Sequence, residues 1–365
     1  MAKVYFTDLH VRNGQNLLSK LEKLIRAAGM DQIDFTNKYA AIKIHFGEPG
    51  NLAYLRPNYA KVVSDMVKEL GGKPFLTDCN TLYVGGRKNA LDHLDTAYVN
   101  GFSPFSTGCH VIIADGLKGT DEELVPVNGD YVKEAKIGRA VMDADVIISL
   151  NHFKCHENTG IGGALKNLGM GCGSRAGKME MHSSGKPSVN EASCICCGAC
   201  AKICAHSAIS FEGKKAHINH NRCVGCGRCI GVCPVDAVMP ASDEANDILN
   251  KKIAEYTYAV VHGKPSFHIS LVMDVSPYCD CHSENDIPIV PDVGMFASFD
   301  PVALDKACAD AVNSQPVIPN SQLAKKTAGH DHFASMHPET DWEVCLDHAE
   351  KLGIGTKEYE IVEVK

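Results

Sequence analysis

Residues 223–233 read Cys-Val-Gly-Cys-Gly-Arg-Cys-Ile-Gly-Val-Cys and are followed by Pro234. The same spacing of cysteines occurs upstream, at Cys194, Cys197, Cys200 and Cys204. Three thiolates separated by two residues each wrap one face of a cubane cluster, and the fourth, three residues further on, ligates the other cluster. We therefore expect two [4Fe-4S] clusters, the first held by Cys194, Cys197, Cys200 and Cys233, and the second by Cys223, Cys226, Cys229 and Cys204.

Two other uses of cysteine fit this stretch less well. A zinc ribbon uses two C-x-x-C pairs far apart and needs only four ligands, and a disulfide framework is typical of small secreted domains. Between the two sets, residues 208–218 predict a short hairpin that turns at Gly213. The segment from 190 to 240 thus resembles a bacterial two-cluster ferredoxin, although Ala205 replaces the proline of the first half and Cys196 could compete with Cys197 as a ligand.

The composition limits the class of protein. The 365 residues carry a net charge of -8 with both signs interspersed, which argues against nucleic acid as a partner. The start lacks the apolar stretch of a signal peptide, and no run approaches the roughly 20 apolar residues of a membrane span. We expect a cytoplasmic protein without a membrane span, whose 17 cysteines are reduced, in an anaerobic setting.

Strands and helices alternate along the rest of the chain. This pattern, with near-continuous apolar strands such as residues 146–150, predicts an α/β fold with a mainly parallel sheet flanked by helices. We expect an inserted α+β domain of the two-cluster ferredoxin type at 188–240, between two parts of the α/β domain at 1–187 and 241–365. The expected strands are 3–7, 40–46, 73–78, 111–115, 144–150, 267–273 and 359–364, and the expected helices are 17–28, 57–70, 93–99, 242–261, 300–305 onward and 342–352.

Polar side chains follow several of these strands. The loops at the carboxyl ends of parallel strands form the ligand crevice of such a sheet. Each residue alone could be a cap or a turn, but their recurrence predicts a shared site. We take His45, Asp78, Lys154 and His156 as candidate catalytic residues.

A second candidate feature is the glycine-rich stretch 160–177. Glycine lets backbone N–H groups approach an anion closely, and lysine or arginine supplies the opposing charge. We expect an anion or cofactor site at Lys166, Arg175 and Lys178. The alternative is a flexible loop that packs the insert against the sheet. Neither a Walker lysine motif nor a dinucleotide fingerprint is present, so no nucleotide is implied.

The sequence also leaves room for a flavin or a further metal as an additional cofactor. His152, Cys155, His156 and Cys172 have atoms that suit zinc or iron. Cys279 and Cys281 form a C-x-C pair that is too close for an easy disulfide and suits a metal or the face toward the clusters.

With these residues in hand, the chain resembles the uncharacterised iron-sulfur-centre proteins of anaerobic bacteria and archaea, which combine a domain of unknown function, number 362, with a ferredoxin insert. The resemblance implies [4Fe-4S] binding but names no substrate. The stretches that carry it are 42–48, 75–78, 152–157, 162–172 and 299–305.

Two functions compete at this point. The first is low-potential electron transfer, or an oxidoreductase that passes electrons from the clusters to a redox partner protein or a small anionic substrate. In that case His45, Asp78, Lys154, His156 and Lys166 hold or protonate the substrate near the cluster that includes Cys233. The second is an accessory protein for reductive activation or metallocofactor assembly.

Overall fold

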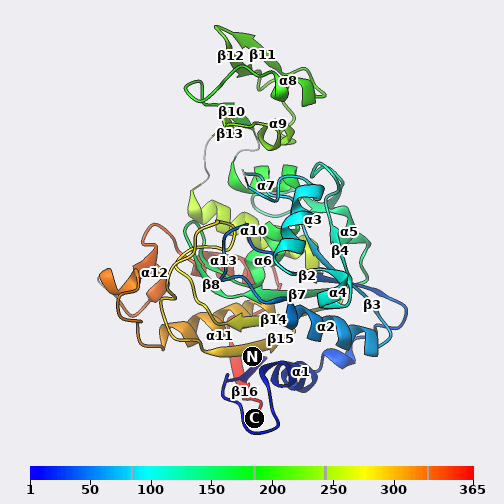
Figure 1. Cartoon of the computed structure of the whole chain (residues 1–365), viewed down its shortest axis with the longest axis vertical. Helices are drawn as coiled ribbons and strands as arrows, with labels where there is room; N and C mark the ends of the chain where they lie inside the picture. Colours follow the sequence, from blue (N-terminus) through cyan, green and yellow to red (C-terminus); the bar gives the residue numbers. More distant parts are fainter. Residues whose placement is uncertain (84, 184–185, 242–244, 327–328) are drawn as a thin grey trace.

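A computed structural model describes the chain from residue 1 to 365, apart from residues 84, 184–185, 242–244 and 327–328. Its centre is an eight-stranded sheet with the order β16-β1-β15-β14-β7-β2-β3-β4 (Figure 1). The strands are β1 (Ala2–Thr7), β2 (Tyr39–Lys43), β3 (Lys73–Asp78), β4 (His110–Ile113), β7 (Val146–His152), β14 (Ser266–Val272), β15 (Gly294–Ser298) and β16 (Tyr359–Glu363).

The sheet is parallel except at one strand. β15 pairs antiparallel with both β1 and β14, and the other neighbouring strands pair parallel. The prediction of an α/β fold with a mainly parallel sheet is therefore confirmed. The sequence pattern did not indicate β15.

Helices cover both faces of the sheet. One face packs on a core to which α1 (Leu17–Ala27) and α2 (Pro57–Glu69) contribute, and the other packs on α6 (Ala164–Cys172), α10 (Asn246–Val261) and α11 (Pro301–Asn313). The remaining helices are α3 (Ala90–Val99), α4 (Pro104–Thr107), α5 (Arg139–Asp143), α7 (Arg175–His182), α8 (Ala199–Ile203), α9 (Arg228–Gly231), α12 (His332–Met336) and α13 (Glu343–Lys351).

Alternate residues of the central strands supply the two cores. Ala41 and Ile147 face the α6 side, and Ile42 and Ile148 face the α2 side. A strand that is buried on both faces must be apolar at every position, which explains the continuous apolar runs in the sequence.

In the described part of the chain, four short antiparallel ladders lie outside the central sheet. They are β5 (Glu122–Pro126) with β6 (Glu134–Gly138), β8 (Lys154–His156) with β9 (Gly160–Gly162), β10 (Pro187–Val189) with β13 (Val238–Pro240), and β11 (Ile209–Glu212) with β12 (Lys215–Ile218). The last is the hairpin predicted around Gly213.

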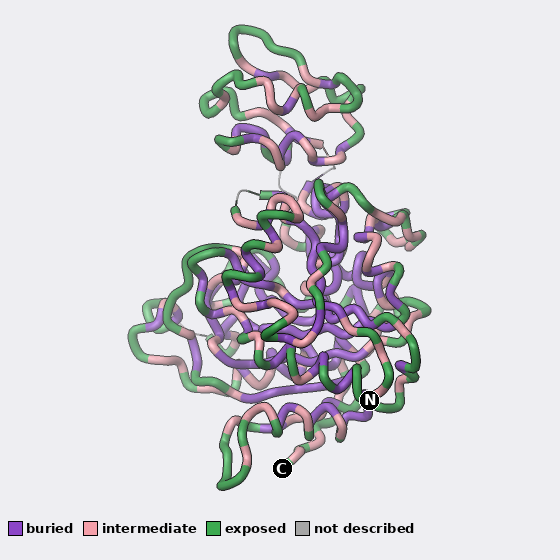
Figure 2. The backbone as a smooth tube through the Cα atoms, turned by 45° about the vertical axis from the view of Figure 1, so that its right-hand side comes forward, coloured by how far each residue is buried: buried purple, intermediate pink, exposed green. Residues whose placement is uncertain are grey.

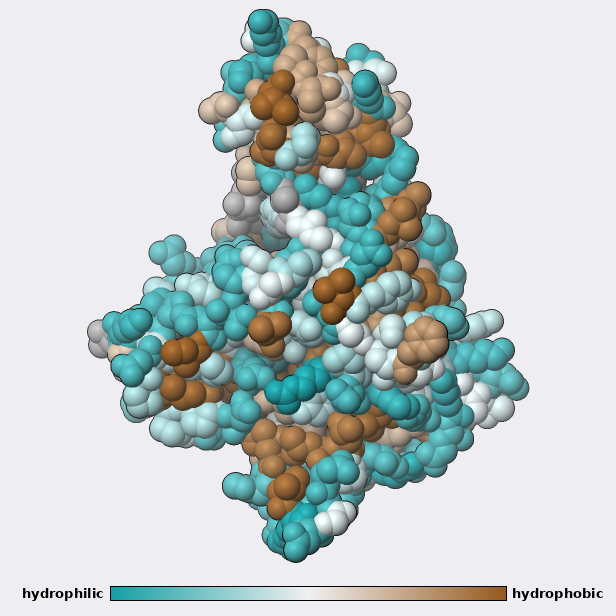
Figure 3. Space-filling view, viewed as in Figure 1, coloured by the Kyte–Doolittle hydropathy of each residue, from teal (hydrophilic) through white to brown (hydrophobic). Residues whose placement is uncertain are grey.

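The cysteine-rich segment forms a lobe above the sheet domain, which we call the insert (residues 187–240). β10 and β13 pair at its base, where the chain enters and leaves it. In the space-filling view a narrow waist separates the lobe from the body (Figure 3). Most of the lobe is exposed or half-buried, whereas the central strands are buried (Figure 2).

Several predicted boundaries shift. Helix α10 begins at Asn246, and residues 242–244 of the predicted helix lie outside the described part of the chain. Asn151 and His152 belong to β7 and do not follow it. Among the described residues, no helix combines the length and the apolar character required to span a bilayer.

Candidate functional site

A cavity of about 420 Å³ lies at the carboxyl ends of the parallel strands. The four candidate catalytic residues, His45, Asp78, Lys154 and His156, all line it. Tyr83 and His282 are exposed and also line it, so the cavity opens to the surface. The sheet topology explains why these four residues lie together, because β2, β3 and β7 are adjacent and parallel and their carboxyl ends share one edge of the sheet.

The floor of the cavity contains a buried ion pair. Lys43 Nζ lies 2.9 Å from Asp78 Oδ1 and donates to Asn167 Oδ1 at 2.7 Å. Burial raises the pKa of Asp78, but Lys43 and then the other neighbouring basic groups together outweigh this and hold that pKa well below its usual range. Asp78 is therefore an ionised anchor for Lys43 and a poor general acid.

Arg87 forms the next layer of the wall. Its Nε lies 2.7 Å from Glu48 Oε2, and its Nη1 lies 2.9 Å from His45 Nε2. The N–H of Gly47 lies 3.0 Å from the other ring nitrogen of His45. Burial and then Arg87 push the pKa of His45 well below 6.5. A doubly protonated ring would turn both of its N–H groups toward these donors, so His45 is neutral, accepts at only one nitrogen, and is poorly suited to donate a proton.

His152 is held in the opposite state. Its Nδ1 lies 2.9 Å from Asp280 Oδ2, and its Nε2 lies 2.8 Å from the carbonyl oxygen of Met273. Only a ring with protons on both nitrogens donates in both directions. Lys154 Nζ is 3.3 Å from the same carboxylate. Burial opposes ionisation of Asp280, but His152 and Lys154 keep its pKa well below the usual value.

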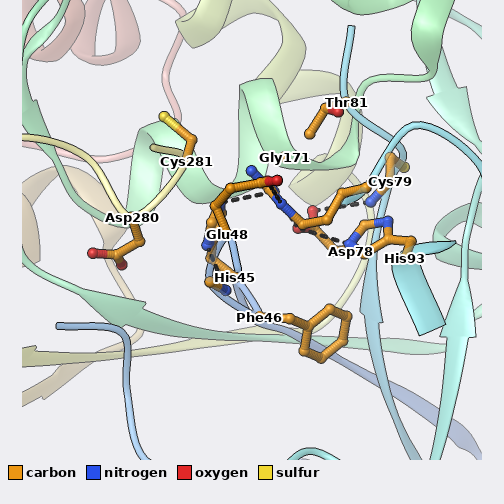
Figure 4. A network of polar contacts seen from close by, with 12 residues as sticks. His45, Phe46, Glu48, Asp78, Cys79, Thr81, His93, Gly171, Asp280 and Cys281 are labelled. Atoms are coloured by element: carbon orange, nitrogen blue, oxygen red, sulfur yellow. Dashed lines mark hydrogen bonds and ion pairs between the residues drawn. The ribbon is translucent and has the colours of Figure 1, made fainter. Parts of the chain in front are cut away.

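The C-x-C pair lies on the cavity wall. Cys279 is buried, and its Sγ accepts from Lys166 Nζ at 3.3 Å and from the backbone N–H of Cys281 at 3.4 Å. One nitrogen of His156 and the two sulfur atoms lie within 4.8 Å of one another, so the group has the atoms of a metal site. Figure 4 shows Cys281 turned away from the carboxylate of its neighbour Asp280.

The protonation of His156 argues against metal at this group. Its Nδ1 accepts the backbone N–H groups of Asn158 at 3.1 Å and Thr159 at 3.3 Å. A neutral ring whose Nδ1 accepts carries its proton on Nε2, and a protonated nitrogen has no lone pair for a metal. His156 is therefore an N–H donor beside the two sulfur atoms.

The predicted group of His152, Cys155, His156 and Cys172 is not assembled. Cys155 and Cys172 are fully buried in the hydrophobic core, and neither lines the cavity. Their thiols have raised pKa values because of burial, to about 11 at Cys172, as expected for inert core cysteines.

The glycine-rich stretch is not a loop. It forms β9, α6 and α7, and its glycines allow close packing: a Cβ at Gly169 would overlap the carbonyl oxygen of Ile253 in α10. Of the three predicted anion ligands, Lys166 and Lys178 line the cavity, but Arg175 does not and faces the insert.

The insert has two matching halves. Gly198 and Gly227 both have positive φ and precede the short helices α8 and α9. The N–H of Ala208 donates to Cys204 Sγ at 3.4 Å, and the N–H of Ala237 donates to Cys233 Sγ at 3.2 Å. Because only glycine takes this conformation without strain, the local backbone repeats along with the cysteine spacing.

Cysteines from the two halves of the insert lie close to one another. Cys204, Cys223, Cys226 and Cys229 all line one small cavity of about 20 Å³. Burial raises the pKa of Cys200, and the neighbouring thiols Cys197 and Cys233 add to this effect. Cys204 of the first run thus lies with three cysteines of the second, and Cys233 of the second lies near Cys200 of the first.

The second triad faces the body. A Cβ at Gly231 of α9 would overlap the guanidinium of Arg175, and Lys88 Nζ lies 3.3 Å from Asp236. The contact of α9 with Arg175 places this helix, which carries Cys229, next to α7.

The insert also reaches the cavity. Leu82 lines the cavity and packs in one hydrophobic cluster with Cys229 and Cys233. Met239 of β13 lines the cavity as well. The cavity therefore lies between the carboxyl edge of the sheet and the cysteine-rich lobe.

Sequence reasoning missed part of this wall. The sequence analysis assigned no role in the site to Lys43, Arg87 or Asn167. Asp280 was noticeable only as the middle residue of the C-x-C pair. One signal for Lys43 was available in the sequence. This lysine ends the apolar run of β2, and a lysine that is buried in a strand requires a buried partner.

Comparisons with known proteins place the chain in a family. A 124-residue stretch, 34% of this chain, is 27% identical to the "Thylakoid-associated protein sll1697" of Synechocystis sp. and spans 35% of that protein.

Among solved structures, a Thermotoga maritima protein from a structural genomics consortium is 14% identical with a TM-score of 0.43. The match covers 83% of this chain and 59% of that protein's chain. The lactate racemase apoprotein of Thermoanaerobacterium thermosaccharolyticum is 10% identical with a TM-score of 0.42, covering 86% of this chain and 58% of its own. This chain thus matches about a third of the curated relative and somewhat over half of each solved structure. Residues 40–310 match the family described as "Domain of unknown function (DUF362)", and the chain belongs to that family.

Proposed function

We propose that the chain is an iron-sulfur protein with two [4Fe-4S] clusters that delivers electrons to a small anionic substrate or cofactor in the cavity. The observation that carries the proposal is the shared wall: Leu82 and Met239 join the cysteine-rich lobe to a cavity that contains cationic side chains. When bound, the clusters supply single electrons at low potential.

The cysteines of the insert fit this role. Cys204 lines one small cavity with the second triad, and Cys233 lies near Cys200, which supports two cross-linked ligand sets. The N–H groups of Ala208 and Ala237 donate to sulfur atoms of these sets. Hydrogen bonds to ligating sulfur stabilise the more negative reduced state, so they favour electron uptake.

Two lysines are the proposed anion contacts. Lys166 and Lys178 line the cavity, and in the described part of the chain neither ammonium has a carboxylate within ion-pair distance. The other cations there are committed, Lys43 to Asp78, Arg87 to Glu48 and Lys154 to Asp280. An anion would therefore find its countercharge at Lys166 and Lys178.

Proton delivery is assigned to His156 and Lys166. Electron transfer from a cluster brings no proton, so reduction of a substrate requires a separate donor. His156 Nε2 and Lys166 Nζ both carry protons toward the cavity, whereas donors face both nitrogens of His45. Among the candidate catalytic residues, we propose Asp78 and Lys154 as positioning groups.

The first test is cluster content. Anaerobically purified chain is expected to contain about eight iron atoms with matching acid-labile sulfide, and to show electron paramagnetic resonance signals after dithionite reduction. Cys200→Ala and Cys226→Ala should each lose about half of that iron, one cluster apiece. Cys196→Ala is the matched control and should keep both clusters, since Cys196 is exposed and outside both sets. Zinc in place of iron, or full iron in Cys204→Ala, would contradict the assignment.

The second test is anion binding near the clusters. Inorganic phosphate is expected to alter the signal of the reduced clusters in the wild type, and this change should disappear in Lys166→Met and Lys178→Met. Lys133→Met removes an exposed lysine outside the cavity and should respond like the wild type. An unchanged response in both cavity variants would exclude this anion site.

A further inference from the structure

We propose that Cys279 and Cys281 form a redox-active dithiol on the cavity wall that exchanges with small anionic disulfides. Cys279 is the attacking sulfur and Cys281 the resolving sulfur. This inference deepens the proposed function, since it names the substrate class and uses the proposed clusters as the electron source.

The surroundings of Cys279 are those of a stabilised thiolate. Its Sγ accepts from Lys166 Nζ at 3.3 Å and from the N–H of Cys281 at 3.4 Å, and His156 lies within 4.8 Å of both sulfur atoms. As argued above, His156 carries its proton on Nε2. Donors thus surround the sulfur of Cys279.

The two thiols are not equivalent. A hydrogen bond from the side-chain thiol of Cys281 lowers the pKa of Cys279 well below 9, and Lys166 and Lys154 add to this after the opposing effect of burial. The same hydrogen bond raises the pKa of Cys281. One thiolate beside one protonated thiol is the pairing that thiol–disulfide exchange requires.

The exchange balances in two steps. The thiolate of Cys279 attacks one sulfur of the substrate disulfide, the substrate S–S bond breaks, and the first substrate thiolate leaves. Cys281 then attacks the mixed disulfide, the second substrate thiolate leaves, and the proton of Cys281 passes to a departing thiolate. Two electrons from low-potential one-electron donors, the class of the proposed clusters, together with one proton break the Cys279–Cys281 disulfide and restore the thiolate of Cys279 and the thiol of Cys281.

The short spacing favours that restoration. A disulfide between residues two positions apart is strained, and strained disulfides have more oxidising potentials. A low-potential donor therefore reduces it readily. The C-x-C spacing that disfavours a structural disulfide suits a catalytic one.

The cavity selects the substrate. It measures about 420 Å³ and opens at Tyr83 and His282, so it admits a small molecule. Lys166 and Lys178 supply positive charge to it. A small disulfide with carboxylate groups matches both features.

The probe is the anionic aromatic disulfide 5,5′-dithiobis(2-nitrobenzoate), added to full-length anaerobic protein, with peptide mapping by mass spectrometry. In the wild type we expect release of two thiolates per chain from this site and a Cys279–Cys281 disulfide. Cys281→Ala should release one thiolate and retain the aromatic adduct on Cys279, and Cys279→Ala should release none in the fast phase. Lys166→Met should slow the reaction about tenfold, the effect of one nearby charge, while Lys133→Met should match the wild type.

The outcomes separate this inference from the proposed function. In Cys226→Ala, which lacks the second cluster, exchange at Cys279 should persist because it needs no external electron, and only re-reduction should fail. The proposal is overturned if Cys279 in Cys281→Ala forms no adduct, or if one divalent metal ion per chain is bound and is lost in both Cys279→Ala and Cys281→Ala.

Discussion

Asp305 illustrates how a single buried carboxylate organises two elements of this protein. It lies in α11, is 1% exposed, and accepts the N–H of Ala164 at 2.7 Å and that of Leu165 at 2.9 Å. These N–H groups belong to the first turn of α6, which has no partner of its own for them. Burial nevertheless raises the pKa of Asp305 to about 7, despite the two hydrogen bonds.

This pKa predicts a specific pH dependence. Because the folded pKa lies above 3.8, the ordinary pKa of an aspartate, the folded state binds the proton more tightly than the unfolded state between about pH 4 and 7. Stability is therefore greatest at the acid end and falls as the pH rises through that window, with a limiting slope of about 1.4 kcal/mol per pH unit. In denaturant unfolding from pH 5 to 8, Asp305→Asn should lose this part of the slope.

The control for this measurement is Glu134→Gln. Glu134 is exposed in β6, so its replacement should leave the wild-type slope in place. Parallel pH curves for the wild type and Asp305→Asn would show that burial of Asp305 does not control this dependence.

At the scale of elements, the contact of α6 with α10 positions the cavity. Lys166 and Asn167 lie on α6, and their location depends on how closely this helix approaches its neighbour. Thr257 of α10 donates to the carbonyl oxygen of Leu165 at 2.8 Å, and Gly169 leaves no room for a side chain against Ile253. The glycines that suggested an anion loop therefore serve helix packing.

Gly169→Ala is expected to destabilise the protein by roughly 1–3 kcal/mol, because the added methyl meets backbone that cannot rotate away. This loss should exceed the gain of about 1 kcal/mol that alanine brings to a helix. Denaturant unfolding measures it. Gly329→Ala adds the same methyl where the nearest atom is Ser335 Oγ at 3.4 Å, and should change stability little. Equal stability of both variants would contradict the packing argument.

At the scale of the whole molecule, the second half of the insert packs against the body, whereas the first half does so less closely at the matching position. Gly231 lies against Arg175, whereas the corresponding position of the first half is Lys202, whose side chain is exposed. A lysine is therefore tolerated where the repeat faces away from the body, and a glycine stands where it faces α7. This difference lets α9, which carries Cys229, pack against Arg175 of α7.

Gly231→Ala should displace Arg175 and loosen the insert without removing cluster ligands. We expect faster amide hydrogen exchange in α7 and α9 and unchanged iron content. Lys202→Ala changes the matching position of the other half and should leave exchange in α7 as in the wild type. Unaltered exchange in Gly231→Ala would show that this contact does not hold the lobe in place.

The sequence by itself determined the features that depend on neighbours along the chain. The cysteine runs at 194–204 and 223–233, the hairpin at Gly213 and the alternation of strands and helices all follow from spacing over a few residues. Local periodicity and turn chemistry act over that range, so they were readable. The alternation of strands and helices also predicted that His45, Asp78, Lys154 and His156 lie at one edge of a parallel sheet, and all four line the cavity there.

Only the tertiary structure decided what those side chains can do. Cys279 meets Lys166 across 113 positions, and His152 meets Asp280 across 128, so no local pattern reveals either pair. The protonation of His45, His152 and His156 depends on which donors and acceptors the fold brings to each ring. Burial and partner geometry set the chemistry of an ionisable group, and both arise only when distant segments pack together.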